Sequence, residues 1–308
     1  YKMSWTIAIP SYKRADQVVK KSLATLKRYN IPSSQINIFV EADQVDEYKE
    51  AVGSDAVVVS RGHCSSIMEA RNKIINHYAK GKQFIFMDDD VTAFKEVKGK
   101  KLVDLPSLKE LINRGFALCK KHGFHLWGVY PAANAFYMKS DDEYSRTLKF
   151  IVGAFMGVIN QKILVNTQHN KEDYLLSILY YLKDGGVIRF NKVAVRFGVG
   201  QKGGIDKDDK GRMKIQKDAT NFLVDKYPTL VRKNPQREGE VLLNKAEAET
   251  PTRPDPELKG GATHRENFLK ANNLEDKGYS LAKLAKISSV SKKTLQDVYN
   301  RGIGATRR

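Results

Sequence analysis

Four short apolar segments alternate with helix-like segments in the first 90 residues, and this alternation restricts the fold more than any other feature of the sequence. The apolar segments read WTIAIPSY (5–12), INIFVEAD (36–43), DAVVVSRG (55–62) and KQFIFM (82–87). The segments between them, 17–30, 45–53 and 65–81, carry apolar residues at helical spacing. Strands separated by helices of this length predict right-handed βαβ units, and therefore an α/β fold built on a parallel sheet.

Polar or charged residues follow each of the four predicted strands. These residues are Pro10 to Arg14, Asp43, Ser60 to His63, and Asp88 to Asp90. In open α/β sheets, ligands bind beyond the carboxyl ends of the strands. We therefore expect a ligand site of nucleotide type at this edge of the sheet, with the three aspartates inside it.

The three adjacent aspartates in FMDDDV (86–91) allow two interpretations. Asp is common where a strand ends and a turn or helix begins, so the three residues could simply cap the next element. Alternatively they bind a divalent cation, because Mg²⁺ and Mn²⁺ take oxygen ligands and compensate clustered negative charge. If strand geometry persists, Asp88 and Asp90 point the same way. Their place at a strand's carboxyl end favours the metal site.

The remainder of the chain predicts a mixed pattern and a second domain. Helices are expected over 105–123 and 171–185, strands over 125–138, 147–160 and 185–197, and a mobile loop over 200–220. The Pro-, Gly- and charge-rich stretch after residue 235 is typical of a linker. We expect a first domain at 1–235, a linker at 236–262 and a small all-α domain at 263–308.

The charge of the chain favours a polyanionic partner. Lys and Arg outnumber Asp and Glu by 53 to 35, which gives a formal charge of +18. Nucleic acid is the first candidate and an anionic surface the second, although cationic charge can also serve solubility alone. The two cysteines, Cys64 and Cys119, predict neither a disulfide framework nor a zinc site. Without a signal pattern or an apolar run of roughly 20 residues, a cytoplasmic protein that does not enter a membrane is expected.

A strand ending in IPSY, a second ending in an acid, a helix containing ARN (70–72) and the FMDDDV strand end together resemble glycosyltransferases of the GT-A fold. The resemblance covers about residues 3–230 and implies a nucleotide-sugar donor of UDP type with Mn²⁺ or Mg²⁺. It implies that Asp90 binds the metal directly and that Asp88 contacts the metal or the ribose. The residues it implies for the nucleotide are Pro10, Tyr12, Arg14, Asp43, Arg61, Arg71, Asp88 and Asp89.

The same resemblance assigns a role to the acidic pair Glu172 and Asp173, which lies at the start of a predicted helix. In inverting enzymes of this fold, one member of such a pair is the general base, and here that member is Asp173. An acid is also favoured in the first turn of any helix. No histidine lies between Asp173 and His264 to complete the metal shell, so water, a diphosphate oxygen or a loop residue remain candidates for the third ligand.

Residues 279–302 resemble a helix-turn-helix, although a small helical packing module fits the same pattern. Between residues 259 and 308 there are 11 Lys or Arg against 4 Asp or Glu. Lys292, Lys293 and Arg301 lie on or beside the second helix, where we expect contacts with DNA phosphates.

A nucleotide-sugar transferase joined to such a module resembles the phage and TET/JBP-associated glycosyltransferases. That resemblance implies transfer of a sugar to a hydroxymethylated pyrimidine in DNA, which requires access through the major groove or base flipping. Four aromatic residues offer stacking surface, although such residues are more often core: Trp127, Tyr130, Phe136 and Tyr137. Two alternatives remain open: a protein, lipid or glycan acceptor, and a DNA-binding protein or nuclease that uses Mg²⁺. The sequence does not distinguish the sugar, the base, the stereochemical outcome or the oligomeric state.

Overall fold

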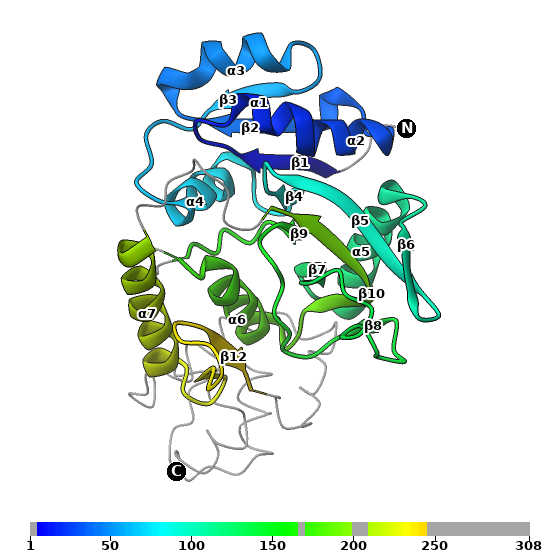
Figure 1. The fold of residues 1–308 in the computed structure, drawn as a ribbon, viewed down its shortest axis with the longest axis vertical. Coiled ribbons are helices and arrows are strands. Elements are labelled where there is room, and N and C mark those ends of the chain that lie inside the picture. The colour runs from blue at the N-terminus through cyan, green and yellow to red at the C-terminus, as the bar shows by residue number, and fades with distance from the viewer. Residues whose placement is uncertain (1–4, 166–169, 199–208, 245–308) are drawn as a thin grey trace, which may run out of the picture.

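One mixed sheet with helices on both faces forms the centre of the computed structural model, which describes residues 5–165, 170–198 and 209–244 (Figure 1). The strands are β1 Trp5–Pro10, β2 Ile36–Val40, β3 Val57–Ser60, β4 Gln83–Met87, β5 Val91–Lys98, β6 Lys101–Asp104, β7 Leu126–Tyr130, β8 Tyr144–Ser145, β9 Phe155–Ile159, β10 Ile188–Phe197, β11 Val231–Lys233 and β12 Val241–Leu243. The helices are α1 Ala15–Val18, α2 Ala24–Arg28, α3 Val45–Val52, α4 Ile67–His77, α5 Leu108–His122, α6 Glu172–Asp184 and α7 Asp209–Lys226. A π-helical turn, Val19–Leu23, joins α1 to α2. The predicted α/β fold is confirmed.

The strand order in the large sheet is β3-β2-β1-β4-β9-β7-β10-β5-β6, and β8 pairs with β10. Strands β3, β2, β1 and β4 are mutually parallel, as the alternation of segments predicted. β9 then runs antiparallel to both β4 and β7, so β7 has the direction of β4. The carboxyl ends of β1, β2, β3, β4 and β7 therefore lie at one edge of the sheet.

Side-chain alternation along the strands produces two hydrophobic cores, one on each face of the sheet. On one face, Ile7 and Ile9 pack with apolar residues of α1, α2, α3 and α5. On the other face, Ala8, Phe84 and Phe86 pack with α4, α6 and α7. Ser66 accepts a hydrogen bond from the N–H of Glu69 and caps α4. No helix in the described part of the chain is both long and apolar enough to span a membrane.

The chain after residue 200 differs from the prediction. The expected loop over 200–220 is wrong for its second half, because α7 begins at Asp209. The strands β11 and β12 pair across residue 235, where a domain boundary was expected. Leu223, Val231 and Val241 are buried in the same core as α6, so the folded unit continues to at least Asn244. The remainder of the predicted linker and the domain at 263–308, with Lys292, Lys293 and Arg301, lie outside the described residues.

Trp127 belongs to the core and offers no stacking surface, because its side chain is fully buried. Gly115 of α5 and Gly157 of β9 lie against its indole ring. A methyl group added at Gly157 would lie 1.9 Å from the indole nitrogen, and one at Gly115 would lie 2.4 Å from the ring carbons. The two glycines therefore provide the space that the indole occupies.

Replacing Gly157 by alanine should lower the free energy of unfolding by about 1–3 kcal/mol, because the added methyl group overpacks the Trp127 ring. Urea unfolding measures the change. The double variant Gly157→Ala/Trp127→Phe should lose less stability than the two single changes predict together, since the smaller ring leaves room for the methyl group. Additive losses would show that the indole is not the source of the effect.

Candidate active site

The three aspartates form the turn that joins β4 to β5. β4 ends at Met87, so the strand alternation expected to align Asp88 with Asp90 does not extend to them. The hydroxyl of Ser22, in the π-helical turn, donates to the carbonyl oxygen of Asp88 at 2.7 Å and accepts from the N–H of Val91 at 3.0 Å. One side chain therefore holds both ends of the aspartate turn.

Each carboxylate of the aspartate turn has a different environment. Asp89 accepts a hydrogen bond from the Ser11 hydroxyl at 2.6 Å and lies 3.4 Å from a guanidinium nitrogen of Arg14. Asp88 is half-buried and pairs with Arg71 at 3.2 Å. Asp90 is only 7% exposed, yet within the described ranges its side chain makes no hydrogen bond or ion pair. Asp90 is therefore the carboxylate that remains available to a ligand.

Burial and mutual repulsion raise the pKa of two of these aspartates. Burial, followed by the charges of Asp88 and Asp89, raises the pKa of Asp90 to about 6. Burial also raises the pKa of Asp89, and the hydrogen bond from Ser11 and the charge of Arg14 oppose it. A cation placed beside Asp90 would favour its ionised form, because an opposite charge nearby lowers the pKa of a carboxyl group.

Arg71 joins the aspartate turn to the acidic pair. Its side chain comes from α4 and is 2% exposed. The guanidinium donates to Asp88 at 3.2 Å and to the carbonyl oxygen of Gly153 at 3.1 Å, and its Nε lies 3.1 Å from Oε1 of Glu172. The guanidinium also lies over the ring of Phe86, 4.9 Å from its centroid. Arg71 is therefore a buried residue of the site and not a solvent-exposed helix charge.

Glu172 and Asp173 form the first turn of α6, as predicted. Asp173 accepts hydrogen bonds from the N–H of Gly153 at 3.0 Å and from the N–H of Tyr174 at 2.9 Å. Two main-chain donors therefore fix the direction of its carboxylate. Burial raises the pKa of both Glu172 and Asp173, while the charge of Arg71 opposes the shift. Proton affinity above that of an ordinary carboxylate suits a general base.

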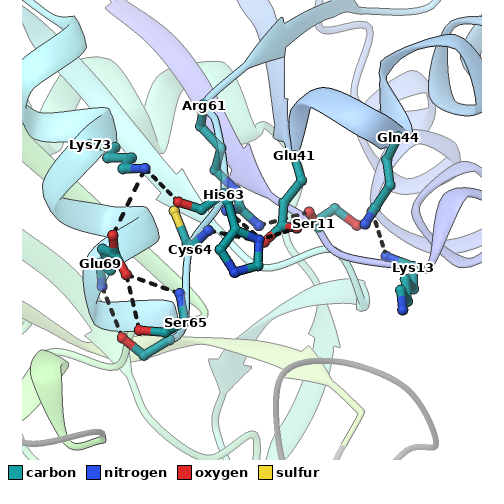
Figure 2. Close-up of polar contacts among 11 residues, drawn as sticks. Ser11, Lys13, Glu41, Gln44, Arg61, His63, Cys64, Ser65, Glu69 and Lys73 are labelled. Atoms are coloured by element: carbon teal, nitrogen blue, oxygen red, sulfur yellow. Dashed lines mark hydrogen bonds and ion pairs between the residues drawn. The ribbon is translucent and has the colours of Figure 1, made fainter.

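A second polar cluster lies at the ends of β2 and β3, where Figure 2 shows side chains gathered around Glu41. The buried Glu41 carboxylate accepts from the N–H of Cys64 at 3.0 Å, and His63 Nδ1 lies 3.0 Å from its other oxygen. Arg61 lies 3.6 Å from Glu41 and donates to the carbonyl oxygen of Ser11. Burial alone would raise the pKa of Glu41, but the hydrogen bonds from Cys64 and His63 lower it. Glu41 is therefore a buried anion beside the carboxyl end of β1.

Some of the residues predicted to bind the nucleotide lie outside this cluster, and a residue that was not predicted lies inside it. Pro10 ends β1 in a buried position, and Tyr12 is half-buried with the Lys13 ammonium 5.2 Å from its ring centroid. Asp43 is exposed in a short helical turn, and Glu41 is the acid that lies inside the cluster. Sequence reasoning missed Glu41, although it directly follows the apolar run of β2.

Ser11 lies in the segment Pro10 to Arg14 that was expected at the ligand edge, whereas sequence reasoning missed Tyr48. The Tyr48 hydroxyl lies 2.7 Å from the Ser11 hydroxyl and accepts the N–H of Arg14 at 2.9 Å. Together they connect Asp89 to α3. In the sequence, Tyr48 shows only the apolar spacing of a helix.

The carboxylates of the aspartate turn suit a hard divalent cation that a substrate helps to hold. In the described part of the chain, no group of three or more His, Cys, Asp or Glu side chains is arranged to bind a metal by itself. Mg²⁺ in phosphoryl-binding sites usually takes one or two carboxylates, with substrate phosphates and water completing the shell. Asp90 and Asp88 fit that donor set, since Asp90 is unpaired and Asp88 has one side exposed.

Replacing Asp90 by asparagine should stabilise the metal-free protein near neutral pH. The folded-state pKa of Asp90 is raised from 3.8 to about 6, so its contribution to stability is present at low pH and is lost as pH rises through 6. Asparagine does not titrate, and the variant should be about 1–2 kcal/mol more stable at pH 7 after allowance for solvent screening. Urea unfolding with a chelator at several pH values measures the difference, which should disappear below a pH of about 4. A variant less stable than the wild type at neutral pH would contradict the electrostatic account.

The chain resembles known glycosyltransferases in sequence and in fold. The family model described as TET-Associated Glycosyltransferase matches residues 5–173. Staphylococcus aureus TarS is similar at 13% identity and a TM-score of 0.46, over 97% of this chain and 55% of that one. A structure of glucosyl-3-phosphoglycerate synthase from Mycobacterium tuberculosis, in complex with Mn²⁺, UDP and phosphoglyceric acid, has 10% identity and a TM-score of 0.44 over 71% of this chain and 77% of that one. No curated protein matches the sequence.

The family match covers more than half of the chain and contains every feature of the edge described above. It begins with β1, includes the Glu41 cluster, Arg71 and the aspartate turn, and ends with the acidic pair. The chain therefore belongs to the TET-associated glycosyltransferase family and is a glycosyltransferase.

Proposed function

We propose that this protein transfers a sugar from a UDP-type nucleotide sugar to the hydroxymethyl group of a modified pyrimidine in DNA, with inversion at the sugar carbon. The observation that carries the proposal is the Arg71 side chain, which joins the aspartate turn to Glu172 at the carboxyl edge of the sheet. The carboxylates that could bind a metal–diphosphate group therefore lie next to the acidic pair that contains the candidate base. A glycosyl transfer needs both within reach of one sugar carbon.

The donor side of the proposal uses the aspartate turn and the Glu41 cluster. We assign Asp90 and Asp88 to the bound Mn²⁺ or Mg²⁺. The cation, when bound, supplies positive charge that stabilises the leaving nucleoside diphosphate. Asp89 is held by Ser11 and Arg14, so its role is to orient the end of β1 near the nucleotide. Glu41 is a buried acceptor suited to an N–H of the base or a ribose hydroxyl.

On the acceptor side, Asp173 is proposed to take the proton of the attacking hydroxyl. Gly153 and Tyr174 hold its carboxylate from the main chain, and that fixed direction favours proton transfer from one approach. Glu172 pairs with Arg71 and is assigned a positioning role. This division of roles follows from the contacts, because Glu172 forms the ion pair with Arg71, whereas the contacts of the Asp173 carboxylate in the described residues are main-chain hydrogen bonds.

DNA is proposed as the acceptor on two grounds. The family model is described as TET-associated, and the resemblance to glycosyltransferases of that kind implies a hydroxymethylated pyrimidine in DNA as the acceptor. The chain also has a formal charge of +18, and counterion release from phosphates favours such cations. The predicted domain at 263–308, with Lys292, Lys293 and Arg301, is proposed to hold the duplex through its phosphates.

A thermal-shift experiment tests the donor site. UDP at about 100 times its Kd, added with Mn²⁺, should stabilise the protein by roughly 2.7 kcal/mol. Asp90→Asn should abolish the part of the shift that requires Mn²⁺, because the free carboxylate is lost. The matched control is Asp16→Asn, which removes an acid whose side chain is 88% exposed on α1 and should leave the shift unchanged. A full shift in Asp90→Asn would place the metal elsewhere.

Sugar transfer to DNA tests the complete proposal. A panel of nucleotide sugars should give transfer to duplex DNA that contains hydroxymethylated pyrimidine and none to plain DNA. Asp173→Asn should lower kcat by about 100-fold or more, because it removes the base, while the shift with Mn²⁺ and UDP remains. Mass spectrometry of the digested DNA detects the product.

Three results would contradict the acceptor assignment. The first is no transfer to hydroxymethylated DNA with any common nucleotide sugar. The second is transfer to a protein, lipid or glycan, together with DNA affinity that is insensitive to salt. The third is cleavage of DNA with Mg²⁺ in the absence of nucleotide sugar, which would indicate a nuclease.

A further inference from the structure

The loop that follows β7 exposes two adjacent aromatic side chains. Phe136 is 65% exposed and Tyr137 is 62% exposed, which makes them the most exposed of the large hydrophobic side chains in the described ranges. Their rings are 5.1 Å apart and nearly perpendicular, with an interplanar angle of 84°. Two apolar rings in contact with water are less favourable than the same rings buried against another surface. A ligand that covers the two rings would therefore gain binding free energy from the apolar area that it buries.

Hydrogen bonds within the loop fix the positions of the two rings. The N–H of Phe136 donates to the side-chain oxygen of Asn134 at 2.9 Å, and the N–H of Tyr137 donates to the carbonyl oxygen of Asn134 at 3.1 Å. The Tyr130 hydroxyl donates to the carbonyl oxygen of Tyr137 at 2.9 Å. The next side chain, Met138, is buried and anchors the loop. The rings are therefore presented by an ordered loop, which lowers the entropy cost of binding.

The register of the sheet places this loop at the edge that carries the aspartate turn. Gly128 of β7 pairs with Met156 of β9, and Met156 pairs with Phe86 of β4. Tyr130 and Asp88, each two residues further along, are therefore level with one another. Two strand spacings, or about 10 Å, separate them across the sheet. The aromatic loop thus begins beside the proposed metal site.

The charges around the rings favour an aromatic ligand attached to a phosphate chain. The Lys139 ammonium lies 4.0 Å from the centroid of Phe136, and the Arg189 guanidinium lies 4.8 Å from the centroid of Tyr130. Asp141 and Asp142 follow in the same loop and are exposed. Because these acids repel phosphate, a phosphate group can bind only near Lys139. The two rings therefore contribute to ligand binding by stacking and not by charge.

We propose that Phe136 and Tyr137 stack on an unpaired nucleobase of the acceptor DNA, next to the base that receives the sugar. Base–aromatic stacking tolerates any base, because every base has a π-face. A flipped target leaves its neighbours without a stacking partner on one side, and the rings replace that partner. The inference rests on the proposed function for the identity of the acceptor, whereas stacking itself is measurable without donor or metal.

Binding of a fluorescent single-stranded oligonucleotide to the full chain, without donor or metal, tests the stacking. Phe136→Ala and Tyr137→Ala should each weaken binding by about tenfold, and Phe136→Leu should lose as much, since leucine keeps the apolar area but not the ring. Phe136→Trp should bind within about twofold of the wild type. The matched control is Val57→Ala, which truncates a side chain that is 49% exposed on the edge strand β3 and should change nothing.

Salt dependence and photochemical crosslinking separate stacking from other contacts. Lys139→Ala should reduce the slope of log affinity against log salt by about 0.7, while the two alanine variants at the rings leave the slope unchanged. Irradiation with an oligonucleotide that contains iodouracil should crosslink the peptide with Phe136 and Tyr137. Wild-type affinity in both alanine variants with crosslinks only elsewhere, or full binding by Phe136→Leu, would overturn the proposal.

The outcomes distinguish this inference from the proposed function. Lost oligonucleotide binding in the ring variants, in a protein that transfers no sugar to DNA, supports the stacking and rejects the acceptor chemistry. Normal binding and transfer by the same variants supports the acceptor chemistry and rejects the stacking. Thermal unfolding should be unchanged in all ring variants, because both side chains are exposed.

Discussion

The burial of one guanidinium group determines much of this structure. An arginine that is 2% exposed must have anionic or carbonyl partners, because an unpaired charge in a low-dielectric interior is costly. Arg71 obtains them from three separate segments: the aspartate turn, the main chain at Gly153 and the start of α6. A Cβ atom at residue 153 would lie 2.7 Å from the guanidinium, so only glycine permits this approach. The aspartate turn and the acidic pair of α6 are therefore positioned by the same buried contacts that form the core.

The aspartate turn shows how three neighbouring carboxylates can coexist in a partly buried position. Two of them are compensated by arginines from different segments, Arg14 directly before α1 and Arg71 of α4, and the third is left without such a partner in the described part of the chain. The uncompensated charge of Asp90 is costly in the absence of a cation and favourable in its presence. Functional sites commonly retain such local destabilisation, since the ligand relieves it.

Much of the fold, and less of the site, could be predicted from the sequence. The parallel strands and their helices follow from local periodicity, so they were predicted correctly. Three features depend on contacts between distant segments. Glu41 rather than Asp43 is buried because residues 61–64, which follow β3, pack against its carboxylate. Trp127 and Phe136 fall in the same predicted strand, but β7 ends at Tyr130, so Trp127 is buried in the sheet and Phe136 is exposed in the loop that follows. α7 was missed because 8 of its 18 residues are charged and few of its apolar residues reach the core.

The π-helical turn Val19–Leu23 has a consequence for how this family can tolerate changes in length. A π-helical turn contains one residue more than the α-helical turn it replaces, and such turns are frequent at functional sites. Deleting a single residue there would regularise the helix without shortening any loop. In this chain it would rotate Ser22 away from the carbonyl of Asp88 and the N–H of Val91. The extra residue therefore sets the rotation of the helix at which the Ser22 hydroxyl faces the aspartate turn.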